Sequence, residues 1–191
     1  EELNHRVKNT LAIVQSMANQ SMRPGLSPEE GRATFAGRLR ALAAAHDSLI
    51  REDWQRSTLR RVVEDARDSV GVPEERVRIE GPPVALAAKE AVAMTLGLHE
   101  LFTNAIKHGA LSVSRPPACV SVTWTVSAQA EPELRVEWAE TGGPDVAPPE
   151  RKGFGSQLVR QALAAELGAE VALEFPRAGV RCTIVMPRPP A

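Results

Sequence analysis

A chain of 191 residues can form one large domain, or one domain with a small helical unit attached. The formal net charge at pH 7 is only −1, so the composition does not indicate a basic surface and we expect no nucleic-acid partner. No apolar run approaches the roughly 20 residues that span a bilayer. No secretory signal is visible either, so we expect a cytoplasmic location and no membrane segment in this stretch.

The first helix is predicted over residues 1–22, which include the stretch ELNHRVKNTLAIVQ. At about 100° per residue, its apolar side chains fall on one narrow stripe. The stripe consists of Leu3, Val7, Leu11, Val14 and Met17. His5 lies on the opposite side of the helix, at about 200° from Leu3, where it faces water.

A second helix is predicted from Pro28 to about Glu52, after Pro24 and Gly25 end the first one. Ser27 is a suitable N-cap before Pro28. The expected apolar side of this helix carries Phe35, Leu39, Leu42, Leu49 and Ile50. A hairpin of this kind buries one face of each helix, so it requires a second hairpin or another domain as cover.

The composition changes after Trp54, and the rest of the chain is predicted to form a mixed unit. We expect helices over 58–70, 87–109 and 154–168, and strands over 77–80, 119–126, 133–140, 170–175 and 180–187. A loop rich in Gly and Pro covers 142–153. Because these elements lack a regular βαβ rhythm, the fold class is predicted to be α+β, a layered sandwich with helices on one face of a mixed sheet. Cys119 and Cys182 lie in strand-like runs and are expected to be small core residues.

The long helix contains the stretch HELFTNAIKHGAL, residues 99–111, with a polar face and an apolar face. The polar face carries Glu100, Thr103, Asn104, Lys107 and His108. The apolar face carries Leu98, Leu101, Phe102, Ala105 and Ile106. A carboxylate, an amide oxygen and an ammonium at successive turns suit Mg²⁺ with its waters and a phosphate, although a solvated face with i,i+4 ion pairs has the same pattern.

Two glycine-rich stretches follow, and they strengthen the phosphate interpretation. ETGGP (140–144) comes after a predicted strand, and GFGS (153–156) comes directly before a predicted helix. Gly153 and Gly155 permit close approach of the backbone, and the amides at Gly155 and Ser156 are suited to phosphate oxygens. The combination with the Asn104 helix is far more specific than a lone pair of glycines.

In this order, the segments resemble the kinase core of a sensor histidine kinase, with the Bergerat-type ATP-binding domain that gyrase and heat-shock chaperones also contain. More narrowly, the sequence resembles the HWE family, named for a histidine in the N-box and a Trp-x-Glu in the G1 box. The matching residues are His99 in HELFTNAIKHGAL, and Trp138 and Glu140 in EWAETGGP; LNHRVKNTLAIVQ matches the H-box. The resemblance covers nearly the whole chain. It implies a phosphoacceptor hairpin of the dimerisation type over 1–53 and an ATP-binding domain over 54–191.

The resemblance implies ATP and Mg²⁺ as cofactors and a role for each matching residue. His5 would accept the γ-phosphoryl group, and Asn104 would coordinate Mg²⁺ while Glu100 orients a metal-bound water. Lys107 would neutralise phosphate charge, and Glu140 would accept the adenine amino hydrogen where related domains carry an aspartate. The other residues expected to bind ATP are His108, Gly142, Gly143, Gly153, Gly155, Ser156 and Thr183.

One departure from the family pattern concerns the group that accepts the proton of His5. Many histidine kinases have an acidic residue directly after the phosphoacceptor, whereas this chain has Arg6. Glu1, Glu2 and Asn9 lie within a turn of His5 and are alternatives on spacing alone. The sequence also assigns no chemical role to His99.

We therefore expect an autophosphorylating protein histidine kinase of a two-component system, with a response regulator receiver domain as its partner. The chain opens on Glu1, and we expect a longer protein whose upstream sensor domain is missing from this stretch. The hairpin stripe could pair in a homodimer, or it could pack on the ATP-binding domain of its own chain and leave a monomer.

The main alternative is a catalytically weak scaffold or phosphotransfer module of the same fold, and intact Asn104, Lys107, Gly153 and Gly155 argue against it. A serine kinase with the same ATP fold would need no His-bearing hairpin, and an ATP-driven clamp would need further domains.

Overall fold

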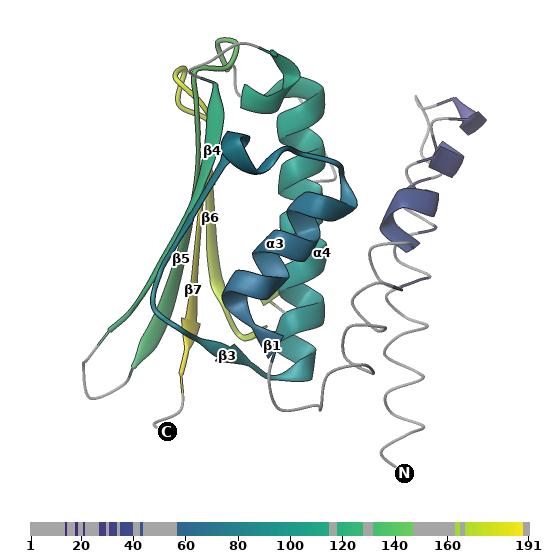
Figure 1. Ribbon diagram of the computed structural model, residues 1–191. Coiled ribbons are helices and arrows are strands. Elements are labelled where there is room, and N and C mark those ends of the chain that lie inside the picture. Colours follow the sequence, from purple (N-terminus) through teal and green to yellow (C-terminus); the bar gives the residue numbers. More distant parts are fainter. Residues whose placement is uncertain are drawn as a thin grey trace.

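The computed structural model describes residues 57–114, 118–127, 132–146 and 167–188, with shorter stretches elsewhere (Figure 1). The shorter stretches are residues 14, 18, 21, 27–29, 31–33, 35–39, 43 and 163–164. Figure 1 shows one sheet with helices packed against one of its faces, and a further helical segment beside them on the side away from the sheet. The prediction of an α+β fold with helices on one sheet face is thereby confirmed.

The main sheet has five strands in the order β2-β4-β5-β7-β6. The strands are β2 (Val77–Glu80), β4 (Cys119–Val126), β5 (Glu133–Thr141), β6 (Glu170–Glu174) and β7 (Arg181–Pro187). β2 runs parallel to β4, and the other neighbours pair antiparallel, so the sheet is mixed. Each of these strands was expected within a residue of its observed bounds, because strict alternation of apolar and polar residues marks a strand with one buried face.

Two helices cover the buried face of the sheet. α3 (Leu59–Ser69) begins after Thr58, whose hydroxyl accepts a hydrogen bond from the Arg61 N–H at 3.3 Å. α4 (Ala88–His108) is the long helix, and the carboxylate of Glu90 accepts the Ala87 N–H at 2.8 Å at its start. Both helices agree with the predicted ranges within about two residues.

The core lies between these helices and alternate residues of the central strands. Its fully buried side chains include Leu59, Val63, Met94, Leu98, Phe102, Val120, Val122, Leu134, Val136 and Met186. The ring of Trp138 meets that of Phe102 edge to face, with centroids 4.8 Å apart. Cys182 is a buried free thiol, and Cys119 is a half-buried one. Trp124 and Trp138 are also core side chains, 3% and 2% exposed.

The shortest elements of the fold were not predicted from the sequence. β1 (Ser57–Thr58) pairs with β3 (Ala85–Leu86) as a separate two-stranded sheet. The single turns η1 (Glu74–Arg76) and η2 (Ala110–Ser112) were also not predicted. An element of two or three residues is shorter than the window in which a hydrophobic period can be detected.

Several predictions are corrected or lie outside the described residues. Leu39 and Ile106 were expected on apolar faces, but they are 41% and 36% exposed. The helix start at Pro28 is confirmed, because residue 28 is helical and residue 27 is not.

Most of the helix expected over 1–22 lies outside the described residues, as does the later part of the loop over 142–153. Of the helix expected over 154–168, the residues described as helical are 163, 164 and 167. No described helix has both the length and the apolar character needed to cross a membrane.

Candidate functional site

The predicted polar face of α4 divides into a buried part and an exposed part. Glu100 is only 7% exposed, although it was expected on the polar face of the helix. Asn104, one turn further on, is half-buried, and Lys107 and His108 near the end of the helix are exposed. The Thr103 hydroxyl donates to the carbonyl oxygen of His99 at 2.7 Å, so it is used within the helix. The amide of Asn104 and the ammonium of Lys107 are thus accessible on adjacent turns at the C-terminal half of α4.

Glu100 is buried because a distant segment covers it. Arg38 donates from Nη2 and Nε to the Glu100 Oε2, at 3.0 and 3.3 Å. The same guanidinium donates from Nη1 to the Ser21 hydroxyl at 3.1 Å. Arg38 is 6% exposed and Ser21 is fully buried. The sequence analysis missed Arg38, since an arginine on an amphipathic helix has no pattern that separates a buried role from a surface role.

The buried carboxylate of Glu140 connects the G1-box strand to the end of α4. Its Oε2 accepts the Ala110 N–H at 2.8 Å, and its Oε1 accepts the Trp138 indole N–H at 3.2 Å. Trp138 and Glu140 are two apart on β5, so they share the face that points toward the helices. Burial raises the pKa of Glu140, and the two hydrogen bonds oppose that rise.

Glycines allow the G1-box turn to approach the end of α4. A Cβ added to Gly143 would lie 2.6 Å from the Ala110 Cα, and one added to Gly109 would overlap the Glu140 carboxylate. Gly142 has a φ of +72°, a left-handed conformation that favours glycine. Side chains at these positions would push the turn and the helix end apart. The spacing of the two segments therefore depends on glycine.

A second charged side chain holds η2 from the other side. Arg76 donates from Nη2 to the carbonyl oxygens of Ala110 and Val113, at 3.0 and 2.9 Å. Its Nε donates to the carbonyl oxygen of Ala118 at 2.8 Å. Ala110 thus has its N–H bound by a carboxylate and its carbonyl bound by a guanidinium. These contacts fix the backbone directly after the exposed His108.

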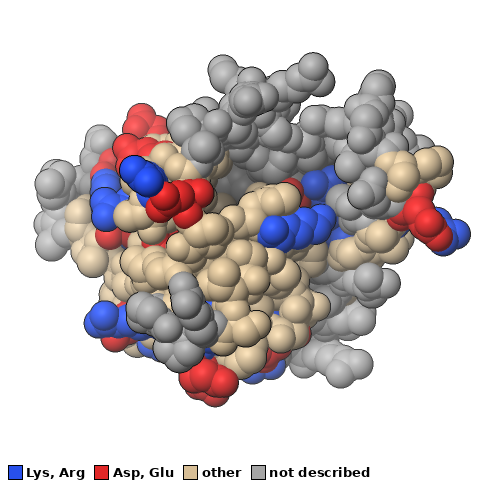
Figure 2. All heavy atoms as spheres, turned by 90° about the horizontal axis from the view of Figure 1, so that it is seen from above, with Lys and Arg blue, Asp and Glu red and all other residues tan. Residues whose placement is uncertain are grey.

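The structure brings together one group of the predicted residues. Asn104, Lys107 and His108 lie on the last turns of α4, and η2 links them to Glu140 and to the turn at Gly142 and Gly143. Figure 2 views the molecule from above, toward the end of Figure 1 where α4 finishes. The drawn residues on this face present a largely uncharged surface with charged side chains of both signs, and no extended area of one sign.

Other predicted residues are not part of this group. Thr183 is half-buried between Cys182 and Ile184, which are buried against the helices, so its side chain lies on the opposite face of the sheet from Glu140. The structure does not bring Thr183 to the other predicted residues, and we do not retain it as an adenine contact. His5, Gly153, Gly155 and Ser156 lie outside the described residues.

The donor set at the end of α4 fits Mg²⁺ and nucleotide phosphates. Mg²⁺ takes one or two protein oxygens and fills its other positions with water and phosphate oxygens. The half-buried Asn104 amide can supply one oxygen, and the Lys107 ammonium can pair with phosphate. Among the described residues, no group of three or more His, Cys, Asp or Glu side chains gathers as a metal site.

The chain resembles histidine kinases in sequence. The family model described as HWE histidine kinase matches residues 2–83. A blue-light-activated histidine kinase of Brucella ovis is 37% identical over 191 residues, which cover 99% of this chain and 39% of that protein. The protein of the same name from Brucella anthropi is 39% identical, with 97% of this chain and 38% of that protein covered. This chain thus spans about two fifths of the length of these curated relatives.

The fold is also that of histidine kinases. The Erythrobacter litoralis EL346 blue-light activated histidine kinase superposes with a TM-score of 0.60 at 24% identity, covering 97% of this chain and 57% of that one. The histidine kinase domain of the same protein gives 0.56 at 18% identity, with 91% and 92% covered. The mixed sheet with its helices is the Bergerat-type ATP-binding fold of such domains. The family model over residues 2–83 and the identity to the curated relatives show that this chain is similar to HWE histidine kinases, and it has the fold of histidine kinase domains.

Proposed function

We propose that this chain is the core of a sensor histidine kinase of a two-component system. It transfers the γ-phosphoryl group of ATP to its own His5 and then to an aspartate of a response regulator. The observation that carries the proposal is the connection between Glu140 and Ala110, which joins the Trp-x-Glu strand to the end of the helix with Asn104 and Lys107. A nucleotide bound at this end of the sheet would meet both segments.

The reaction requires the ring nitrogen of His5 to attack the γ-phosphorus. A nitrogen–phosphorus bond forms, the bond to the bridging oxygen breaks, ADP leaves, and the imidazole loses its proton to a base. Neutral imidazole is populated near pH 7, so His5 is a nucleophile without metal activation. Positioning and electrostatic stabilisation supply most of the rate enhancement in phosphoryl transfer.

The described residues have distinct roles in this proposal. The Asn104 side-chain oxygen would hold Mg²⁺, which would supply neutralising charge to the phosphate oxygens. Lys107 would add positive charge for the phosphates, and Glu100 would orient a water of the metal. Glu140 supports the adenine end. The remaining nucleotide contacts are assigned to His108, Gly142, Gly143, Gly153, Gly155 and Ser156.

The proposed organisation is a phosphoacceptor hairpin over 1–53 and an ATP-binding domain over 54–191. Val14 and Phe35, two residues of the predicted apolar stripes, pack against Leu96 of the same chain. This contact supports intramolecular packing of at least this part of the hairpin, and a homodimer would have to use other residues of the stripes. We assign the input to an upstream sensor domain; this chain spans only 39% of a relative named as a blue-light-activated histidine kinase.

Incubation with Mg²⁺ and γ-labelled ATP tests the proposal, with His5→Ala and Asn104→Ala as variants. We expect a label on the protein that is labile to acid and stable to alkali, as a phosphoramidate is, and that is lost in both variants. A label that resists acid and survives His5→Ala would contradict the assignment and indicate hydroxyl phosphorylation. Tight nucleotide binding by a folded chain that acquires no label would favour the scaffold or phosphotransfer alternative.

A further inference from the structure

We propose that Arg38 is a positioning residue that competes with Mg²⁺–nucleotide for Glu100. When the helix that carries Arg38 is docked on α4, the guanidinium binds the Glu100 carboxylate. When that helix undocks, the Glu100 carboxylate becomes available to the nucleotide site. The inference rests on the proposed function, because it assumes that Glu100 acts beside Asn104. It adds a residue and a coupling that neither the family motifs nor the nucleotide fold contains.

The contact follows one stripe of α4. Val92, Leu96 and Glu100 recur every four residues, so they lie on one face of the helix. Phe35 packs against Leu96, and Arg38, three residues after Phe35, binds Glu100 four residues after Leu96. An apolar contact and an ion pair therefore follow each other about one helical turn apart on both helices. This match in register indicates a specific docked arrangement.

The pair is well suited to hold that arrangement. Arg38 donates twice to the Glu100 Oε2 and also to the Ser21 hydroxyl, so the guanidinium binds groups on two segments. A carboxylate that is only 7% exposed is costly to leave without a cation. Departure of Arg38 must therefore be accompanied by water or by another positive charge beside Glu100.

The stripe continues into the proposed nucleotide site. Asn104 follows Glu100 by four residues, so the carboxylate lies between the docking contact and the proposed Mg²⁺ ligand. With Arg38 bound, the charge of Glu100 is compensated and its Oε2 is engaged by two donors. Recruitment of Glu100 to a metal-bound water then requires release of Arg38. By linkage, Mg²⁺–nucleotide favours undocking to the same extent that docking weakens its binding.

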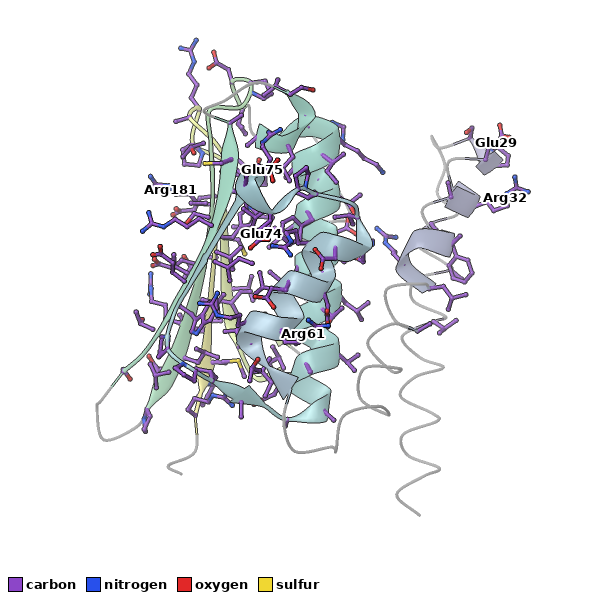
Figure 3. All side chains as sticks on the ribbon, in the orientation of Figure 1. Glu29, Arg32, Arg61, Glu74, Glu75 and Arg181 are labelled. Carbon is purple, nitrogen blue, oxygen red and sulfur yellow. The ribbon has the colours of Figure 1, made fainter. Side chains whose placement is uncertain are left out.

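The test compares Arg38→Gln with Arg32→Gln. Arg32 is on the same helical segment, is exposed, and points away from α4 (Figure 3). The measured quantity is the ratio of the ADP dissociation constant without Mg²⁺ to that with Mg²⁺, by calorimetry. We expect Arg38→Gln to increase this ratio roughly five- to tenfold over the unsubstituted chain, in the range typical of coupled sites, and Arg32→Gln to leave it unchanged. Arg38→Lys keeps the charge but loses the planar guanidinium with its several donors, so its ratio should lie between those of Arg38→Gln and the unsubstituted chain.

A second readout follows docking itself. In a Cys119→Ser background, spin labels are attached at Ala33→Cys and Glu75→Cys, which are exposed positions on the Arg38 helix and on the unit that contains the sheet. The distance between the two labels reports whether the Arg38 helix is docked. We expect Mg²⁺–ADP to add a longer-distance population in the unsubstituted chain, and Arg38→Gln to show that population without nucleotide. Circular dichroism of each variant establishes that the fold is retained.

The outcomes separate the two proposals. If the ratio of ADP dissociation constants without and with Mg²⁺ is the same for Arg38→Gln and Arg32→Gln, Arg38 has a purely structural role and the inference is wrong. If the ratio changes but the distances do not, docking is not what Arg38 controls and the inference is also overturned. If no variant binds ADP, the proposed function fails, and the distance distributions still show whether Arg38 holds the two helices together.

Discussion

The carboxylate of Glu140 binds the backbone N–H of Ala110 at 2.8 Å across a separation of 30 residues. Trp138 donates to the other oxygen of the same carboxylate. The Trp and Glu of the Trp-x-Glu motif therefore form one hydrogen-bonded unit, and the unit is attached to the first residue after the α4 cap. This relationship gives the motif a physical purpose, which is to set the position of the end of the N-box helix.

The pH dependence of stability should report Glu140. Burial raises its pKa above the ordinary 4.5, so the native state binds a proton more tightly than the unfolded state. The contribution of this residue to the free energy of unfolding is therefore greatest at low pH, and it falls as pH rises from 4.5 through the raised pKa. Urea unfolding of the unsubstituted chain and Glu140→Gln across this pH range measures it. The difference between the two should decline with rising pH; a flat or rising difference would be inconsistent with a raised pKa.

Trp138→Phe should raise the pKa of Glu140 further. Phenylalanine keeps the edge contact with Phe102 but removes the indole N–H that lowers the pKa of Glu140. We expect the pKa of Glu140 to rise further, and the free energy of unfolding at neutral pH to fall by about 1–2 kcal/mol for a lost hydrogen bond to a buried charged group. The pKa can be followed by NMR of the carboxyl carbon. An unchanged pKa in a folded Trp138→Phe would show that the indole bond is unimportant.

Gly143→Ala should separate the G1-box turn from the end of α4. The added Cβ meets backbone atoms of Ala110, which cannot rotate away as a flexible side chain would. We expect a loss of about 1–3 kcal/mol in the free energy of unfolding, with weaker ADP binding. Gly37→Ala is the control, since nothing lies within 4 Å of its Cβ position. This helical substitution should stabilise by about 0.5–1 kcal/mol. Equal effects at the two positions would refute the steric account.

Arg76→Met should release η2. The substitution keeps most of the aliphatic length and removes the donors to the carbonyls of Ala110, Val113 and Ala118. We expect the free energy of unfolding to fall by about 2–3 kcal/mol, because charged donors to partly buried carbonyls are lost. Arg78→Gln, which alters an exposed ion pair with Glu80, should leave the urea midpoint unchanged. Similar midpoints for both variants would contradict the role assigned to Arg76.

Alternation along the sequence was sufficient to predict the main sheet. The run CVSVTWTV coincides with β4, in which Val120, Val122 and Trp124 alternate with less buried residues and are buried against the helices. The same rule could have placed Thr183 correctly, since its neighbours Cys182 and Ile184 are the apolar members of the alternation. A threonine between them must face the other side of the sheet. The adenine role assigned to it came from the family resemblance and overlooked this local signal.

The burial of Glu100 could not be predicted in the same way. Helical periodicity places Glu100 among polar residues, and a single helix does not reveal what covers it. Arg38 is 62 residues away, and the pair depends on how two separate units pack. The bond between Glu140 and Ala110 is also a long-range relationship. The sequence thus provides candidate residues for the site, while the partners of the two carboxylates depend on tertiary structure.

The central claim is that the phosphoryl group of ATP ends on the imidazole of His5. The most direct measurement is phosphorus NMR of the chain after reaction with Mg²⁺–ATP, combined with mass spectrometry of its peptides under alkaline conditions. The account predicts a phosphoramidate resonance and a phosphorylated peptide whose modified residue is His5. A phosphate ester resonance, or a phosphoryl group located on any other residue, would contradict it.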